Sequence, residues 1–284
     1  MLALLPACSS VDVLNALVPS EGYSVLSNLA YGHGPRHRLD LYVPDDSNDG
    51  APLIVFFYGG GWETGERRDY RFVGEAFASL GYIVAIPDYR LHPEIRYPAF
   101  LKDAASAIAW VNSEVGAVAK VKTGPLYLTG HSAGAYITAM LTLDQRWLAT
   151  EGLAVCDVVS AAAGLAGPYD FLPLSSRKLK DIFGDPAPYE TQPISHVNGA
   201  APPMMLITGA TDTTVLPRNT TALAATIRAT GGTVQQRVYE DTGHVTLAAA
   251  LAKPLRSLAP TLSDIDHFLR LYPKTEGCRK DVGG

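Results

Sequence analysis

The ten residues LYLTGHSAGA, at positions 126–135, decide the expected fold. An apolar run typical of a buried strand leads into a G-x-S-x-G motif, and a helical pattern follows it. Between a strand and a helix this motif is a nucleophile elbow, a sharp turn that presents Ser132 at the amino end of the helix. Gly130, Ala133 and Gly134 have little or no side chain, as this close approach of strand and helix requires. Ser132 is therefore the candidate nucleophile.

Short apolar runs alternate with longer helical patterns along the rest of the chain. This alternation predicts the α/β class, with a mostly parallel eight-stranded sheet flanked by helices in an α/β-hydrolase fold. The expected helices cover residues 69–80, 99–115, 133–143, 218–230 and 262–271. The expected strands cover residues 23–30, 37–43, 53–58, 82–86, 126–129, 158–165, 204–208 and 234–240.

The length of 284 residues suits one domain of this class. We expect a single α/β-hydrolase domain over residues 21–273, preceded by an N-terminal segment (1–20) and followed by a polar tail (274–284). The proline-rich stretch 167–203 is irregular, and we interpret it as a small lid-like excursion of that domain.

Composition and charge exclude several classes of function. The chain has 23 basic and 28 acidic residues, a net charge of -5, and no basic block, so nucleic acid is not an expected partner. Cys8, Cys156 and Cys278 lack the spacings of a zinc site, and we expect no metal and no cofactor. Their odd number leaves one cysteine free or modified, and spacing gives no argument for pairing Cys156 with Cys278.

The first ten residues, MLALLPACSS, resemble the end of a bacterial lipoprotein signal. As the remnant of a trimmed signal, they would place a lipidated Cys8 at a membrane and the protein in the periplasm or on a lipoprotein anchor. No positive residue precedes Cys8, however, which a secretory signal normally has. The other interpretation is a frayed apolar terminus of a cytoplasmic protein. The oligomeric state is not predicted.

A nucleophilic serine needs a base, which in this fold follows late in the chain after an acidic residue. His244 lies in a glycine-flanked loop after a predicted strand and is our candidate base. Asp212 follows the strand that begins at Met204 and is the candidate acid that orients the imidazole. Asp241, three residues before His244, is the alternative acid.

The glycine-rich stretch YGGGW, residues 58–62, follows the third predicted strand. Acyl transfer needs N–H donors for the oxyanion, which this fold takes from such a loop and from the residue after the serine. We therefore expect Gly60, Gly61 and Ala133 to form the oxyanion hole.

Together with DYRLHPE (residues 88–94) and YPA (97–99), these motifs make the chain resemble the hormone-sensitive-lipase-like and related small microbial carboxylesterases. The resemblance covers nearly the whole chain and implies carboxylic ester hydrolysis. Those enzymes usually carry His-Gly-Gly-Gly, whereas this sequence has Tyr58 at the histidine position, so the subfamily and the substrate stay open. Tyr58, Trp62 and His131 are candidate pocket residues, although for Tyr58 we favour a role in bracing the loop.

The resemblance implies a small-molecule ester as substrate. Since the glycine loop begins as early as Tyr58, we expect no large helical cap, an open site, and a preference for short-chain or aryl esters. Two rival hypotheses are an arylformamidase-like amidase and a binding protein on a retired hydrolase fold, although such proteins usually lack the nucleophile, the base or the oxyanion loop.

Overall fold

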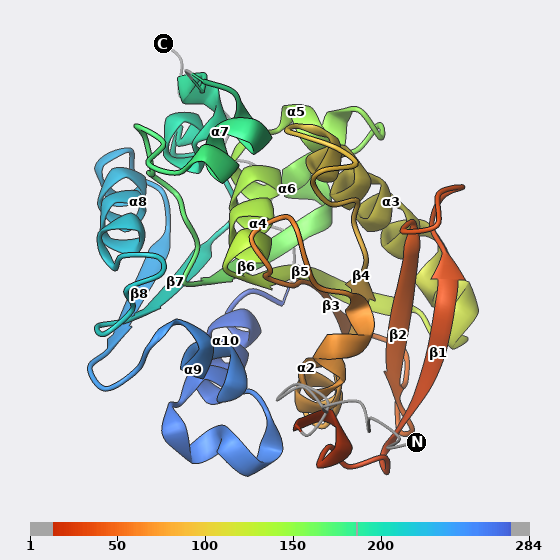
Figure 1. The fold of residues 1–284 in the computed structure, drawn as a ribbon. Helices are drawn as coiled ribbons and strands as arrows, with labels where there is room; N and C mark the ends of the chain where they lie inside the picture. Colours follow the sequence, from red (N-terminus) through yellow and green to blue (C-terminus); the bar gives the residue numbers. More distant parts are fainter. Residues whose placement is uncertain (1–13, 186, 274–284) are drawn as a thin grey trace, which may run out of the picture.

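The eight predicted strands form one sheet in the computed structural model, which describes residues 14–185 and 187–273. The order across the sheet is β1-β2-β4-β3-β5-β6-β7-β8, which can be followed from right to left in Figure 1. The strands are β1 (Tyr23–Ala30), β2 (Arg38–Pro44), β3 (Ala51–Phe57), β4 (Ile83–Pro87), β5 (Thr123–His131), β6 (Val159–Leu165), β7 (Met204–Gly209) and β8 (Val234–Tyr239).

Only β2 runs against its neighbours in this sheet; β4, β3 and β5 to β8 pair in parallel. The central strands are continuous apolar runs because helices cover both of their faces, so neither face meets water. In β3, for example, the run LIVFF (residues 53–57) is almost wholly buried. The predicted mostly parallel sheet is confirmed.

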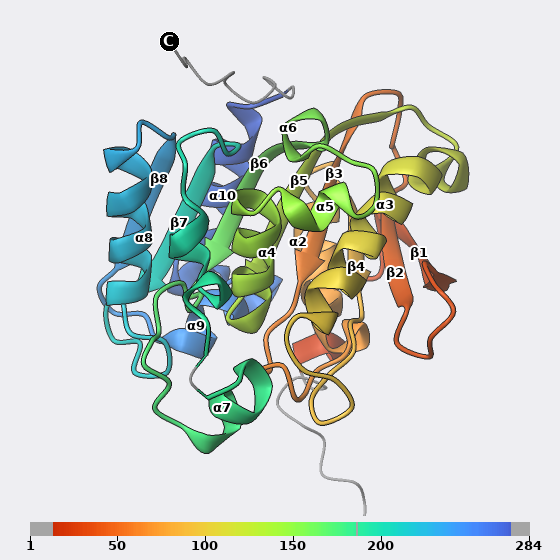
Figure 2. The same ribbon diagram turned by 90° about the horizontal axis from the view of Figure 1, so that it is seen from above.

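Helices cover both faces of the sheet, as Figures 1 and 2 show. One face carries α2 (Arg71–Ala78) and α10 (Thr261–Arg270), and the other carries α3 (Ala99–Ala119), α4 (Ala133–Leu143) and α8 (Arg218–Ala229). Each of these five helices was predicted from its apolar periodicity. The largest difference is at α3, which extends four residues beyond the predicted end at Val115.

The sequence did not predict the short helices, because a turn or two carries too little periodicity to be recognised. They are α5 (Arg146–Ala149), α6 (Val155–Val158), α7 (Arg177–Phe183), α9 (His244–Ala249) and the 3-10 helices η1 (Arg67–Tyr70), η2 (Tyr189–Thr191), η3 (Pro193–His196) and η4 (Lys253–Leu258). The excursion 167–203 contains α7, η2 and η3, and α7 stands apart from the sheet in Figure 2.

Two observations bear on membrane attachment and cysteine pairing. Within residues 14–185 and 187–273, no helix has the length and apolar character needed to cross a bilayer. Cys156 takes part in a disulfide. Cys8 and Cys278 both lie outside the described residues, so lipidation of Cys8 and a bond between Cys156 and Cys278 are not addressed by the structure.

The parallel strands determine where polar side chains can gather. The carboxyl ends of parallel strands lie at the same edge of a sheet, and the loops that follow them converge there. The loops after β3, β5, β7 and β8 carry the glycine stretch 58–62, Ser132, Asp212 and His244. All the predicted site residues therefore come from one edge of the sheet.

Candidate active site

Ser132 has the backbone conformation expected of a nucleophile elbow. Its φ of 56° and ψ of -121° are unusual for a residue other than glycine. The turn is tight because α4 starts directly against β3: a Cβ on Gly134 would lie 1.9 Å from the carbonyl oxygen of Phe57. The N–H of Ser132 also donates to the carbonyl of Leu165 at 2.9 Å, which ties the turn to β6.

The structure brings Ser132, His244 and Asp212 together in one hydrogen-bonded line. Nε2 of His244 lies 2.9 Å from Oγ of Ser132, and Nδ1 of His244 lies 2.7 Å from Oδ2 of Asp212. Because a carboxylate only accepts, Nδ1 carries the proton and Nε2 is free to accept from the serine hydroxyl. In this arrangement the imidazole has the geometry to accept a proton from Ser132.

Asp212 is held in place by the backbone around it. Its Oδ1 accepts from the N–H groups of Thr214 and Val215, both at 2.9 Å, and its side chain is fully buried. The alternative acid, Asp241, is exposed and makes no hydrogen bond or ion pair with His244 within the described residues. His244 is the first residue of α9, whereas the sequence placed it in a loop.

The three predicted oxyanion donors have free N–H groups. Gly60 and Gly61 have positive φ values of 119° and 61°, so these two peptides turn in a way that L side chains rarely allow. The N–H groups of Gly60, Gly61 and Ala133 donate to no other described residue. Free donors next to a nucleophile are suited to a developing oxyanion.

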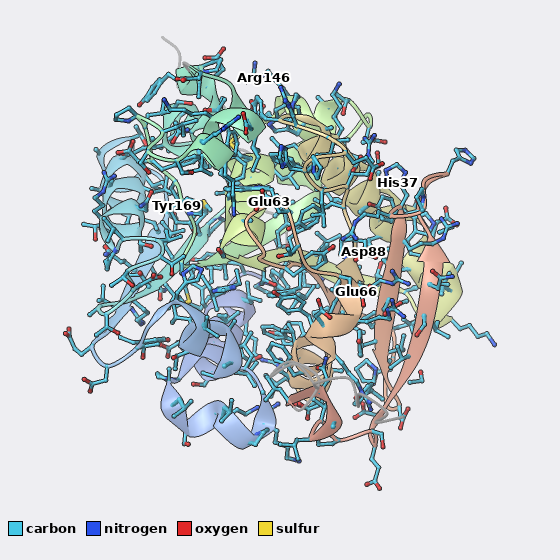
Figure 3. All side chains as sticks on the ribbon, in the orientation of Figure 1. His37, Glu63, Glu66, Asp88, Arg146 and Tyr169 are labelled. Atoms are coloured by element: carbon cyan, nitrogen blue, oxygen red, sulfur yellow. The ribbon has the colours of Figure 1, made fainter. Side chains whose placement is uncertain are left out.

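Tyr58 braces the glycine loop from inside the protein. Its ring is completely buried and stacks on Tyr70 and Tyr89. Burial raises the pKa of Tyr58 well above its ordinary value, so the hydroxyl stays protonated and donates to Asp88 at 2.9 Å while accepting from Arg36 at 2.7 Å. Asp88 lies beside β2 in Figure 3. The expectation that Tyr58 could line the pocket is corrected: its side chain lies behind the loop.

Trp62, the next predicted pocket residue, is part of an aromatic cluster. It is 3% exposed and its ring packs against Phe100, Tyr136, Phe171 and Phe183. One part of Trp62 still lines a cavity at Ser132. Trp62 is therefore both a core residue and a wall of the site.

His131, the residue before Ser132, supports His244. Its Nε2 lies 3.0 Å from the carbonyl oxygen of His244 and donates to it, and the two rings are 4.7 Å apart. Burial, with a further contribution from His244, lowers the pKa of His131 to about 3. His131 is therefore uncharged at neutral pH, and no positive charge from it opposes protonation of His244.

Two cavities meet at Ser132. The Trp62 cavity, of about 700 Å³, is also lined by Ala133, Phe171, Leu179, Leu216 and Arg218. The His244 cavity, of about 540 Å³, is also lined by Leu14, Tyr70, Phe72, His131, Val245 and Leu255. Gly61, Ser132, Lys178 and Thr214 line both. A substrate whose reacting carbon lies at Ser132 can thus extend in two directions.

Lys178, which the sequence analysis missed, joins the excursion to the glycine loop. It lies in α7 and its Nζ is 2.8 Å from Glu63, which is also 3.5 Å from Nδ1 of His92. Figure 3 shows Glu63 near the middle of the molecule. Lys178 also lies against Gly61, where an added Cβ would be 2.9 Å from Nζ. No local motif marks such a residue, because its place depends on how the excursion folds back.

Comparison with known sequences connects the chain to one family and to curated relatives. Residues 39–227 match the family described as BD-FAE. A probable isoprenylcysteine alpha-carbonyl methylesterase of Arabidopsis thaliana is 30% identical over 256 residues, covering 82% of this chain and 53% of that protein. A kynurenine formamidase of Salmo salar is 28% identical over 151 residues, covering 53% of this chain and 48% of that protein. The chain thus spans about half the length of these relatives.

Comparison with solved structures identifies the fold. Esterase B from Lactobacillus rhamnosis, in a complex with a tributyrin phosphonate inhibitor, superposes with a TM-score of 0.78 at 20% sequence identity. The match covers 93% of this chain and 90% of that chain. At this identity the similarity shows the fold alone, and the predicted α/β-hydrolase fold is confirmed.

Replacing Tyr58 by Phe should destabilise the protein. The change removes the hydroxyl between Arg36 and Asp88, and hydrogen bonds to charged groups contribute about 1.5–3 kcal/mol. The control is Tyr127→Phe, which loses a neutral bond to the carbonyl of Tyr272 at 3.0 Å and should cost about 1 kcal/mol. Urea unfolding measures both, and equal losses would contradict a bracing role for Tyr58.

Replacing His131 by Gln should make stability less sensitive to acid. Between the ordinary pKa of 6.5 and the folded value of about 3, the unfolded chain binds a proton that the folded chain excludes. The free energy of unfolding therefore falls with decreasing pH, by up to about 1.4 kcal/mol per unit from this group. His131→Gln should remove that slope, whereas His33→Gln, at an exposed position, should keep it. Urea unfolding across this pH range measures the slope of the free energy of unfolding against pH. If that slope is unchanged in both variants, the prediction is wrong.

Proposed function

Because the chain belongs to the BD-FAE family, we propose that it is a serine carboxylesterase that hydrolyses short-chain or aryl carboxylic esters through an acyl-enzyme. The observation that carries this proposal is the position of His244 between Ser132 and Asp212, at 2.9 and 2.7 Å. Such a line of acid, base and hydroxyl, next to free N–H donors, is the arrangement that acyl transfer requires.

In the first half of the reaction the hydroxyl of Ser132 attacks the ester carbonyl carbon. His244 accepts the hydroxyl proton at Nε2, and Asp212 stabilises the imidazolium and keeps the ring in position. The N–H groups of Gly60, Gly61 and Ala133 donate to the oxyanion. The tetrahedral intermediate collapses when His244 returns the proton to the leaving alkoxide oxygen, which departs as the alcohol.

In the second half, water takes the place of the alcohol. His244 removes a proton from the water as it attacks the acyl-enzyme carbonyl, and the same three N–H groups stabilise the second oxyanion. Proton return to Oγ of Ser132 releases the carboxylic acid and restores the enzyme. Water must reach Ser132 for this step, and both cavities open at that residue.

The size of the site favours small substrates. Its two cavities have volumes of about 700 and 540 Å³, similar to the pockets that hold drug-sized ligands. In the excursion 167–203 the described elements are α7, η2 and η3, all of seven residues or fewer. We therefore propose small-molecule esters in preference to long-chain triglycerides.

One observation favours a second candidate, an arylformamidase-like amidase. The curated relatives include a kynurenine formamidase. The same Ser132, His244 and Asp212 would cleave a formamide, with His244 protonating the leaving amine in place of an alkoxide. The ester proposal ranks first because the probable methylesterase relative is 30% identical and covers 82% of this chain, against 28% and 53% for the formamidase.

We expect hydrolysis of acetyl and butyryl p-nitrophenyl esters that depends on Ser132. Ser132→Ala removes the attacking oxygen and should lower kcat by about 10⁴-fold or more. A matched control is Ser113→Ala, which removes a hydroxyl on α3 that bonds only within its own helix and should retain full activity. Hydrolysis that survives in Ser132→Ala would refute the proposal, as would failure of the wild type to react with a fluorophosphonate probe.

The rates on different substrates should decide between the candidates. We expect acetate and butyrate esters to be hydrolysed faster than a long-chain triglyceride, because both cavities have the volume of a pocket for a drug-sized ligand. We also expect p-nitrophenyl acetate to be a better substrate than N-formylkynurenine, measured as kcat/KM. A triglyceride preference would exclude the short-chain proposal, and a formamide preference would favour the amidase. Feruloyl and methyl esters complete the panel.

A further inference from the structure

The position of His244 indicates which of the two cavities at Ser132 would hold the alcohol half of an ester and which the acyl half. The leaving oxygen must accept its proton from Nε2 of His244, so the alcohol half lies on the side of that ring. His244 lines one cavity and not the other. In the proposed reaction the His244 cavity would thus receive the alcohol, and the Trp62 cavity, on the side of Ala133, would receive the acyl group.

The walls of the two cavities differ in charge. Most residues of the His244 cavity are apolar, among them Phe72, Val245 and Leu255, and Asp69 is part of its wall. Lys178 lines both cavities, and the Trp62 cavity adds a second cationic side chain, Arg218, with no acidic residue among its described lining residues. The acyl side is therefore the positively charged side of the site.

Arg218 supplies the net charge of that cavity. Lys178 is neutralised by Glu63 at 2.8 Å, whereas Arg218 forms no ion pair or hydrogen bond with any described residue through its guanidinium. The nearby Asp170, whose N–H bonds the side chain of Asn219, is not within ion-pair distance of Arg218. Asp212 is occupied by His244 and two backbone N–H groups.

Local stability does not explain an arginine at this position. Arg218 is the first residue of α8, and no acidic residue lies in the first turn of that helix. A cation at a helix amino end opposes the helix dipole, which favours acidic residues there. At this exposed position the arginine gains nothing from the helix dipole, while it adds a positive charge to the wall of the Trp62 cavity.

Resting on the proposed esterase function, we propose that the Trp62 cavity selects acyl groups that carry a carboxylate, with Arg218 as the specificity-determining residue. The substrates are half-esters of short dicarboxylic acids. Trp62 and Phe171 contact the methylene groups of the acyl chain, and the guanidinium pairs with the free carboxylate. Hydrolysis adds one water to the half-ester anion and releases the dicarboxylate, the alcohol and one proton.

The test compares benzyl hydrogen succinate with benzyl succinamate, its neutral amide of the same shape, by the kcat/KM for release of benzyl alcohol. Wild type should prefer the acid by about tenfold or more, as expected of a charge-assisted bond. Arg218→Ala should remove the preference, Arg218→Lys should keep part of it, and Arg218→Glu should reverse it. Added salt should weaken it in the wild type.

The control is Arg228→Ala, which removes an exposed arginine near the other end of α8 and should leave the preference unchanged. Equal rates on the acid and the amide in the wild type would overturn the inference. So would a preference that survives in Arg218→Ala or is lost equally in Arg228→Ala. Benzyl butyrate separates the two proposals: its Ser132-dependent hydrolysis upholds the esterase whatever the succinate result, and its absence removes the esterase proposal.

Discussion

The close approach of α4 to β3 is the constraint on which the site depends. A side chain at Gly134 would meet the carbonyl oxygen of Phe57 at 1.9 Å, so only glycine lets the helix begin there. That contact holds Ser132 at a φ of 56°. It also places Ala133 at the same cavity as Gly61 of the glycine loop that follows β3. Nucleophile and proposed oxyanion donors are thus positioned by one piece of backbone packing.

A set of buried charges behind the glycine loop holds that loop in place. Tyr58 comes directly before the glycine loop, and its hydroxyl connects Arg36 to Asp88. Asp88 also pairs with Arg67, which in turn bonds Asp40 on β2. Each charge has a partner, which limits the cost of burying them. Tyr58 therefore braces the loop from behind and leaves the N–H groups of Gly60 and Gly61 without a partner among the described residues.

The cationic residues that line the cavities come from other parts of the chain than the residues at the strand ends do. Lys178 comes from α7 in the excursion 167–203, and Arg218 comes from the start of α8. Neither residue lies in a motif, and neither has a spacing relation to Ser132 that a sequence would reveal. They line the same cavity because the excursion and the loop after β7 fold over the same sheet edge. The proposed acyl specificity thus resides in the connections, while the proposed chemistry resides in the strand ends.

The sequence by itself determined the fold class, the eight strands, the elbow at Ser132 and the pairing candidates Asp212 and His244. These features follow from local patterns, since strand runs, glycine turns and chain order are visible within a few residues. Only the tertiary structure decided that His244 meets Asp212 and leaves Asp241 exposed, that Tyr58 lies behind the loop, and that Arg218 lines a cavity. Those facts depend on which distant segments pack together, and packing between elements leaves no periodic signal in the chain.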